Sequence, residues 1–380
     1  MVDDFSLPSK CPAGVKAARG ARNTKEHGMN TEFVIVDGSM GEGGGQVLRA
    51  SLALSMALGK PFRMEKIRAN RPKSGLKRQH LTCVKAAQAI CGAAVEGDAI
   101  NSTALSFVPG RVNPGEYLFD VGSGGSVTLV LQAVIPPLLG AAGPSRVTVT
   151  GGTHVPFSPP FEFMRDTLFP WLERLGPRLD AVMARPGFMQ VGGGIVTVDV
   201  SPGDALRPLN ADDAATETTG VSAVIICHNL PEEVADRESA VLLSPQCERL
   251  GLTKDLLRVE GGNSGRRPEG GGNAVLLTLE QGETLTVIGE IGWRGRTAEV
   301  VARQAAKRAL AFRESGTAVE RHLADQLLVP MALAGGGSFI TEKLTPHTRT
   351  CLDLLPLFMD IRAETGEEHG KAVRITLEKH

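Results

Sequence analysis

One short segment combines a helix start with a histidine that could act as a nucleophile. In Thr345-Pro346-His347-Thr348, threonine is a favoured N-cap and proline suits the first helical position. A histidine in the first turn tends to stay neutral, because the helix N-terminus disfavours a second positive charge. Neutral imidazole is the nucleophilic form, so His347 is a candidate for covalent catalysis. A surface or packing role is the alternative on this pattern alone.

A glycine-rich turn near the N-terminus could bind an anion. Residues 41–46 read Gly-Glu-Gly-Gly-Gly-Gln between an expected strand and an expected helix. Free backbone N–H groups at a helix start attract phosphate, although the pattern is neither a Walker A nor a dinucleotide motif. Glu42 would repel phosphate unless a divalent cation bridged the two. A simple tight turn is the alternative interpretation.

Residues 61–80 concentrate positive charge in a chain whose net charge is only −1. A helix N-terminus within this stretch would normally favour acidic residues, so the cations indicate an external anion. The alternative is a loop whose charges point to water. The seven basic residues, set against a single Glu65, are Arg63, Lys66, Arg68, Arg71, Lys73, Lys77 and Arg78.

Strands, glycine turns and helices alternate along the chain, which predicts an α/β architecture. No fixed-period repeat appears in the residues themselves. We expect strands over 33–37, 62–67, 117–121 and 146–150, with helices ending near Leu58, Gly92 and Leu139 and another over 160–175. A polar segment, 209–219, follows. Beyond it we expect strands over 221–227, 275–279 and 285–291, and helices from about 231 and over 297–314. The last elements should be a helix over 318–328, the glycine-rich start of a strand at 335–340, a helix after Pro346 and a final strand over 372–376.

Bulk composition places the chain among ordinary globular proteins. Its 380 residues are 42% hydrophobic and 22% charged, and no run approaches the 18 apolar residues of a membrane span. The first thirty residues lack an apolar signal region and are expected to be a disordered tail or an upstream start ahead of Met29. Six scattered cysteines without a C-x-x-C pattern indicate reduced thiols and a soluble cytoplasmic protein.

Five separated segments together resemble the RNA 3′-terminal phosphate cyclase family. They are DGSMGEGGGQVLR (37–49), IRANRPKSGLKRQHLT (67–82), VGSGGSVTLVLQAVIP (121–136), GGTHVPFSPP (151–160) and HLADQLLVPMALAGGGSFI (322–340).

The resemblance implies an ATP-dependent reaction on RNA carrying a 3′-terminal phosphate. Family members adenylate an active-site histidine and release pyrophosphate, then pass AMP to the RNA 3′-phosphate. The vicinal 2′-hydroxyl attacks that phosphorus, which expels AMP and leaves a 2′,3′-cyclic phosphate. A divalent metal, Mg²⁺ or Mn²⁺, is implied as well.

The resemblance also assigns roles to individual residues. The family's His-x-x-Thr nucleophile pattern falls on His347 with Thr350, and its acidic metal-associated residue falls on Glu42. The catalytic set then comprises His347, Glu42, Arg49, Arg68 and Arg71. Nucleotide-binding residues would be Gln79, Gln132, Pro159, His322, Asp325 and Gln326, with Pro159 and His322 in the adenine pocket.

The fold implied by the resemblance is α/β (α+β), with a large domain of repeated βαβ-type units related to the enolpyruvyl transferase architecture. A smaller α/β domain is inserted into it. We therefore expect a large domain over 31–208 and 317–380 and an inserted domain over 209–316, which begins where the sequence becomes polar and acidic.

This chain departs from the family pattern at two places. Pro186 stands where the family has His or Arg before Gly-Phe, and Gln190 stands where it has Pro before a later glycine run. Cys351 stands where the histidine segment of the family continues to Asn.

One alternative function is a non-catalytic ribosome-assembly factor of the same fold, against which His347, Glu42 and Arg49 argue. Another is a small-phosphate transferase related to the enolpyruvyl transferases.

Overall fold

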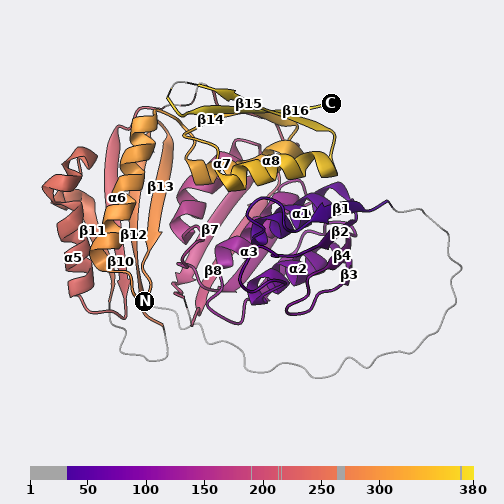
Figure 1. Cartoon of the computed structure of the whole chain (residues 1–380), viewed down its shortest axis with the longest axis horizontal. Coiled ribbons are helices and arrows are strands. Elements are labelled where there is room, and N and C mark those ends of the chain that lie inside the picture. Colours follow the sequence, from indigo (N-terminus) through magenta and orange to yellow (C-terminus); the bar gives the residue numbers. More distant parts are fainter. Residues whose placement is uncertain (1–31, 190, 213, 215, 263–269, 369) are drawn as a thin grey trace, which may run out of the picture. The chain divides into compact units, whose positions relative to one another are not determined.

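The computed structural model describes residues 32–189, 191–212, 214, 216–262, 270–368 and 370–380 (Figure 1). The expected tail, 1–30, and Gln190 lie outside these residues. Described elements form four sheets of four strands each, together with helices, so the expected mixed α/β class is confirmed. In the described part of the chain, none of the helices combines the length and apolarity needed to cross a membrane.

The first sheet is built from two strand–helix units followed by a hairpin. Its strand order is β1-β2-β4-β3, with β1 and β2 parallel and the other pairs antiparallel. Gly59 and Gly92 end the two helices in left-handed conformation, as expected from the sequence. The elements are β1 (Val34–Asp37), α1 (Gly45–Leu58), β2 (Phe62–Glu65), α2 (Arg78–Cys91), β3 (Ala94–Glu96) and β4 (Leu105–Val108).

The second sheet repeats this connectivity. Its order is β5-β6-β8-β7, again with one parallel pair and two antiparallel pairs. The elements are β5 (Glu116–Asp120), α3 (Val127–Leu138), β6 (Ser145–Gly151), the π-helix η1 (Phe163–Leu168), α4 (Phe169–Glu173), β7 (Arg178–Arg185) and β8 (Gly194–Ser201).

The third sheet has the same connectivity, but its chain is interrupted after the first strand. Its order is β15-β16-β14-β9, with β9 and β14 parallel. Three units thus share one topology although no residue repeat is visible in the sequence. The elements are β9 (Leu209–Asn210), α7 (Arg321–Leu333), β14 (Gly336–Thr341), α8 (Pro346–Phe358), β15 (Ile361–Glu367) and β16 (Val373–Lys379).

The interrupting segment forms a sheet of different order, β11-β10-β12-β13. A separate hydrophobic cluster from Val221 to Phe312 packs this sheet against α5 and α6. The domain limits 209–316 stay a prediction. The elements are β10 (Gly220–His228), α5 (Glu233–Leu242), the 3-10 helices η2 (Pro245–Leu250) and η3 (Lys254–Leu256), β11 (Leu257–Gly262), β12 (Gly272–Gln281), β13 (Thr284–Ile291) and α6 (Ala298–Ser315).

Helices of the three repeated units pack on one another. Helix α1 contacts α2, α3, α7 and α8, and Figure 1 shows α7 and α8 between the β14–β16 sheet and α1. Much of α1 is buried and apolar, which allows neighbours on several sides. This packing brings together the candidate residues that α1, α3, α7 and α8 carry.

Two expected helices differ in detail. The expected helix over 160–175 is divided into the π-helical turn η1 and α4, where Pro170 has no N–H to donate. The Thr167 hydroxyl of η1 accepts from the backbone N–H of Val287 in β13, at 2.8 Å. Helix α7 begins at Arg321 rather than Ala318, because the Glu320 carboxylate caps it by accepting from the N–H groups of His322 and Leu323.

Candidate functional site

His347 lies in the first turn of α8, as the sequence predicts. Thr345 is the N-cap and its hydroxyl accepts from the Thr348 N–H at 3.0 Å, while Pro346 takes the first helical position. The side chain of His347 is 37% exposed, so it is partly withdrawn from water but still reachable.

The glycine turn lies directly against the start of α8. Gly41 and Gly43 have φ of +55° and +56°, a region that glycine tolerates best. A Cβ on Gly41 would lie 1.8 Å from the Thr350 hydroxyl oxygen, and one on Gly43 would lie 2.7 Å from the Asn70 amide. These glycines therefore allow the turn to approach α8 closely, and the approach presents Glu42 to His347.

Gln46 holds the His347 ring and decides which nitrogen carries the proton. Its amide nitrogen donates to the backbone carbonyl of His347 and to Oδ2 of Asp325, both at 3.2 Å. A carbonyl only accepts, so the Gln46 amide oxygen faces the ring, 2.5 Å from Nδ1. Nδ1 therefore donates its proton to Gln46, and the lone pair of the neutral ring lies on Nε2.

Charged groups around Nε2 act on His347 in opposite directions. Nε2 lies 3.5 Å from Oε2 of Glu42, which also pairs with Arg71 at 3.0 Å. Burial lowers the pKa of His347 below its ordinary value, Glu42 raises it, and Arg49 and Arg71 lower it. The net direction is downward, which favours the neutral ring near pH 7.

Arg49 and Asp325 are close enough for the charge of each to influence the pKa of the other. Burial lowers the pKa of Arg49, and burial together with nearby Glu320 raises the pKa of Asp325 to about 8 despite the opposing effect of Arg49. A cavity of about 60 Å³ adjoins both side chains and is otherwise lined mainly by apolar residues. Cys351, the departure from the family pattern, is buried in this lining, and its burial raises the pKa of its thiol.

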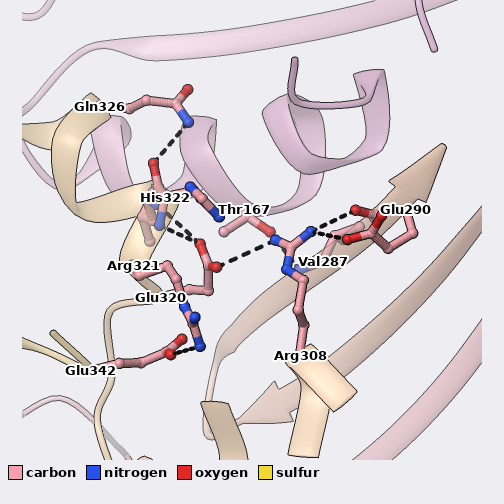
Figure 2. Close-up of polar contacts among 11 residues, drawn as sticks. Thr167, Val287, Glu290, Arg308, Glu320, Arg321, His322, Gln326 and Glu342 are labelled. Atoms are coloured by element: carbon pink, nitrogen blue, oxygen red, sulfur yellow. Dashed lines mark hydrogen bonds and ion pairs between the residues drawn. The ribbon is translucent and has the colours of Figure 1, made fainter. Parts of the chain in front are cut away.

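Two of the predicted nucleotide-binding residues contact each other across the helices. The Gln132 amide in α3 donates to Oε1 of Gln326 in α7 at 2.6 Å, and both line the cavity. Burial lowers the pKa of His322, one turn earlier in α7, and nearby His347 lowers it further. Figure 2 shows Gln326 donating to the His322 carbonyl, with Glu320 beneath the helix start.

The basic stretch is bonded largely within the protein. Arg68 donates to the carbonyls of Lys73 and Gly75, at 2.7 and 3.0 Å, and Arg71 is the member paired with Glu42. Lys77 and Arg78 donate to the Asn101 side chain and the Gly122 carbonyl. Arg71 and Arg78 are nevertheless exposed, and the expectation that this stretch meets an external anion stays a prediction.

Gln79 and Pro159 have local partners. The Gln79 side chain accepts from the N–H of Ser126 at 2.8 Å, which ties α2 to the glycine turn before α3. The Pro159 carbonyl accepts from the Thr128 hydroxyl at 2.8 Å. Both residues position the ends of helices that carry other candidates.

Two residues at the site were not assigned roles from the sequence. Gln46 was quoted only as the end of the glycine motif, although a polar residue in the first turn after such a loop is a signal in itself. His80 accepts from the Lys77 N–H at 3.3 Å and lies beside Gly45, where a Cβ would be 2.4 Å from its Nε2. Burial, Arg49, Arg68 and Lys77 lower the pKa of His80 to about 3, so it stays neutral.

A neutral imidazole with a free Nε2 lone pair, arginines and one carboxylate can attack phosphorus and stabilise the charge that develops. Fold and site together define a mixed α/β protein of three units with a common topology, with a candidate site centred on His347.

Comparison with known proteins names the family. A family model described as RNA 3'-terminal phosphate cyclase matches residues 40–365. Proteins named RNA 3'-terminal phosphate cyclase from Koribacter versatilis, Ectopseudomonas mendocina and Salmonella enteritidis are 43%, 40% and 40% identical to this chain. The matches cover 90%, 92% and 90% of this chain and 94%, 99% and 99% of those relatives. The chain belongs to the RNA 3′-terminal phosphate cyclase family, an enzyme family, and the expected resemblance is confirmed.

Proposed function

We propose that this protein uses ATP to convert the 3′-terminal phosphate of RNA into a 2′,3′-cyclic phosphate, through a covalent adenylate on His347. The observation that carries the proposal is the hydrogen bond from His347 Nδ1 to Gln46, which leaves the Nε2 lone pair free beside Glu42. Family membership supplies the substrate, and the geometry supports the nucleophile. The five cysteines among the described residues are buried and free, which supports the proposed cytoplasmic location.

The proposed reaction proceeds in three substitutions at phosphorus. Nε2 of His347 attacks the α-phosphorus of ATP, forming a P–N bond while the bond to the β-phosphate oxygen breaks and pyrophosphate leaves. An oxygen of the RNA 3′-phosphate then displaces His347, which regains its lone pair. Finally the 2′-hydroxyl oxygen attacks the 3′-phosphorus and passes its proton to water, while the bond from that phosphorus to AMP breaks and AMP leaves. Arg49 and Arg71 would offset the negative charge that builds up in these steps.

Glu42 would hold a divalent metal ion only together with phosphate oxygens of the substrate. Among the described residues no group of three or more His, Cys, Asp or Glu side chains could hold an ion. Mg²⁺ commonly uses one or two carboxylates plus phosphate oxygens and water, and Glu42 supplies one carboxylate near His347. A divalent ion there would neutralise phosphate charge. Arg71, released from Glu42, could then face phosphate.

The test is self-labelling with α-phosphate-labelled ATP and Mg²⁺ or Mn²⁺, followed by mapping of the modified residue. We expect an acid-labile AMP adduct on His347, lost in His347→Ala and kept in Arg349→Ala, an exposed neighbour in the same helix. An adduct that survives His347→Ala would reject the nucleophile. Absence of any adduct would favour the non-catalytic assembly factor, and turnover of phosphoenolpyruvate without ATP–pyrophosphate exchange would favour the transferase.

Variants of Arg71 and Arg68 should distinguish an effect on the labelling reaction from an effect on the stability of the loop. Arg71→Ala should weaken labelling with the fold intact, because its bonded partner Glu42 is exposed. Arg68→Ala should also loosen the loop, since Arg68 bonds two of its carbonyls. We expect a lower thermal midpoint for Arg68→Ala alone.

A further inference from the structure

An exposed aromatic pair lies outside the catalytic residues. The ring of Phe157 is 93% exposed and lies 5.5 Å, centroid to centroid, from the ring of Trp293. Phe157 also has a φ of +65°, a conformation that bulky side chains rarely adopt. Burial in the core does not explain either feature, because a ring so exposed contributes little to folding. Backbone strain at a solvent-exposed aromatic residue points to a binding role.

The indole of Trp293 is supported from the protein side. The guanidinium of Arg296 lies 4.4 Å from the Trp293 ring centroid, and its Nη1 also bonds Glu290 at 2.9 Å. The Arg296 side chain is only 12% exposed, so it is fixed in place. Trp293 is thereby held as a rigid surface, which reduces the entropy lost when a flat ligand stacks on it.

The loop that carries Trp293 also presents an unburied cation. Its residues 292–296 read Gly-Trp-Arg-Gly-Arg, and Arg294 is exposed while Arg296 is not. An aromatic surface beside an exposed arginine suits single-stranded nucleic acid, whose bases stack and whose phosphates attract cations.

Contacts connect this patch to the candidate site. Phe157 lies two residues before Pro159, whose carbonyl bonds Thr128 at the start of α3. On the other side, Arg308 of α6 bonds both Glu290 and Glu320, at 3.0 and 3.5 Å (Figure 2). Glu320 caps α7, the helix that carries Asp325 and Gln326. Glu290 bonds both Arg296, which supports the ring of Trp293, and Arg308, which also bonds Glu320 at the start of α7. These contacts link the aromatic pair to the candidate site.

We propose that Phe157, Trp293 and Arg294 form a stacking platform for bases of the single-stranded RNA that precedes the 3′-terminal phosphate. The platform deepens the proposed function and rests on it, because it positions the RNA whose end is cyclised. Bases stack on the two rings without sequence preference, and Arg294 attracts the phosphate backbone.

The test measures binding of a fluorescent, 3′-phosphorylated, single-stranded oligoribonucleotide by anisotropy. Phe157→Ala and Trp293→Ala should each raise Kd roughly tenfold, while Trp293→Phe restores most of the affinity. Arg294→Ala should lower the salt dependence of Kd. Leu118→Ala removes another exposed apolar side chain, on β5, and should bind as the wild type does.

A second measurement separates the platform from the chemistry. Self-labelling by ATP needs no RNA and should be unchanged in the platform variants, whereas KM for the oligoribonucleotide should rise with kcat nearly constant. Wild-type affinity in both alanine variants would overturn the platform, as would failure of the wild type to bind single-stranded RNA. If RNA binding depends on the rings but no protein–AMP forms, the platform stands and the proposed function fails.

Discussion

At the scale of single residues, the state of His347 results from three competing influences. Burial and the nearby arginines favour the neutral ring, and Glu42 favours the protonated one. A neutral ring is required for attack, so the direction of this balance sets the pH range of the first chemical step.

The first prediction concerns that pH range. Because the pKa of His347 is lowered, self-labelling should persist below pH 6.5 and decline only at more acidic pH. Glu42→Gln removes the group that raises the pKa and should move the acid limb lower, whereas Arg71→Gln should move it higher. Titration of the histidine ring carbons by NMR checks the same shifts without activity. A His347 midpoint above 6.5 would contradict the argument.

We expect the Asp325 carboxyl group to lower the stability of the folded protein at neutral and alkaline pH. Its pKa is raised from about 3.8 to about 8, so between these values the folded state holds a proton that the unfolded state releases. Stability is therefore lost as pH rises through this window. Asp325→Asn should raise the free energy of unfolding at pH 8 by on the order of 1–4 kcal/mol and change it little near pH 4.

Urea denaturation at the two pH values measures this difference. Asp353→Asn, an exposed site in α8, serves as the control and should show no such pH dependence. Equal stability of Asp325→Asn and the wild type at pH 8 would mean that Asp325 is ionised in the folded protein.

At the scale of elements, the site depends on how closely the glycine turn approaches α8. Gly41→Ala would place a methyl group against Thr350 and force alanine into left-handed conformation. We expect a loss of about 2–4 kcal/mol in unfolding free energy and weaker self-labelling, because Glu42 moves with the turn. Gly59→Ala has similar φ but no atom within 4 Å, so it should lose only about 1 kcal/mol. Equal losses would exclude the steric explanation.

Seven described strands were not expected from the sequence, namely β3, β4, β7, β8, β9, β11 and β15, and no single cause covers them, because β8 does show an alternating burial pattern. β7 and β11 are largely exposed on both faces, so they lack the alternating pattern that marks a half-buried strand. β9 has only two residues and is defined by its pairing with β14. Helices α1, α2 and α8, in contrast, carry caps and buried stripes that act locally, and the sequence predicted them closely.

At the scale of the whole molecule, Arg308 connects the interrupting segment to the third unit. Arg308→Met would leave Glu320, which is 1% exposed, without one of its cationic neighbours and would leave Glu290 paired with Arg296 alone. We expect the unfolding free energy to fall by about 3 kcal/mol. Arg249→Met breaks a surface pair with Glu314 and should cost less than about 1 kcal/mol.

Urea unfolding followed by fluorescence and circular dichroism measures both variants. If Arg308 also joins separately stable parts, the two signals should cease to coincide in Arg308→Met. Unchanged stability would show that the network contributes little.

The sequence by itself determined the local elements and the chemistry they could carry. Thr345 and Pro346 favour a helix start at that segment, and the glycines within 41–45 favour a turn, because capping and backbone freedom act between near neighbours. Resemblance then placed the chain in its family.

Tertiary structure alone decided how these parts meet. Gln46 and His347 are 301 positions apart, and their hydrogen bond, which sets the ring's proton, exists only because α1 packs against α8. The common topology of the three units, and the internal bonding of the basic stretch, likewise depend on strand pairing and packing over long separations. Such contacts depend on the complementary surfaces of whole elements, which neighbouring residues do not specify.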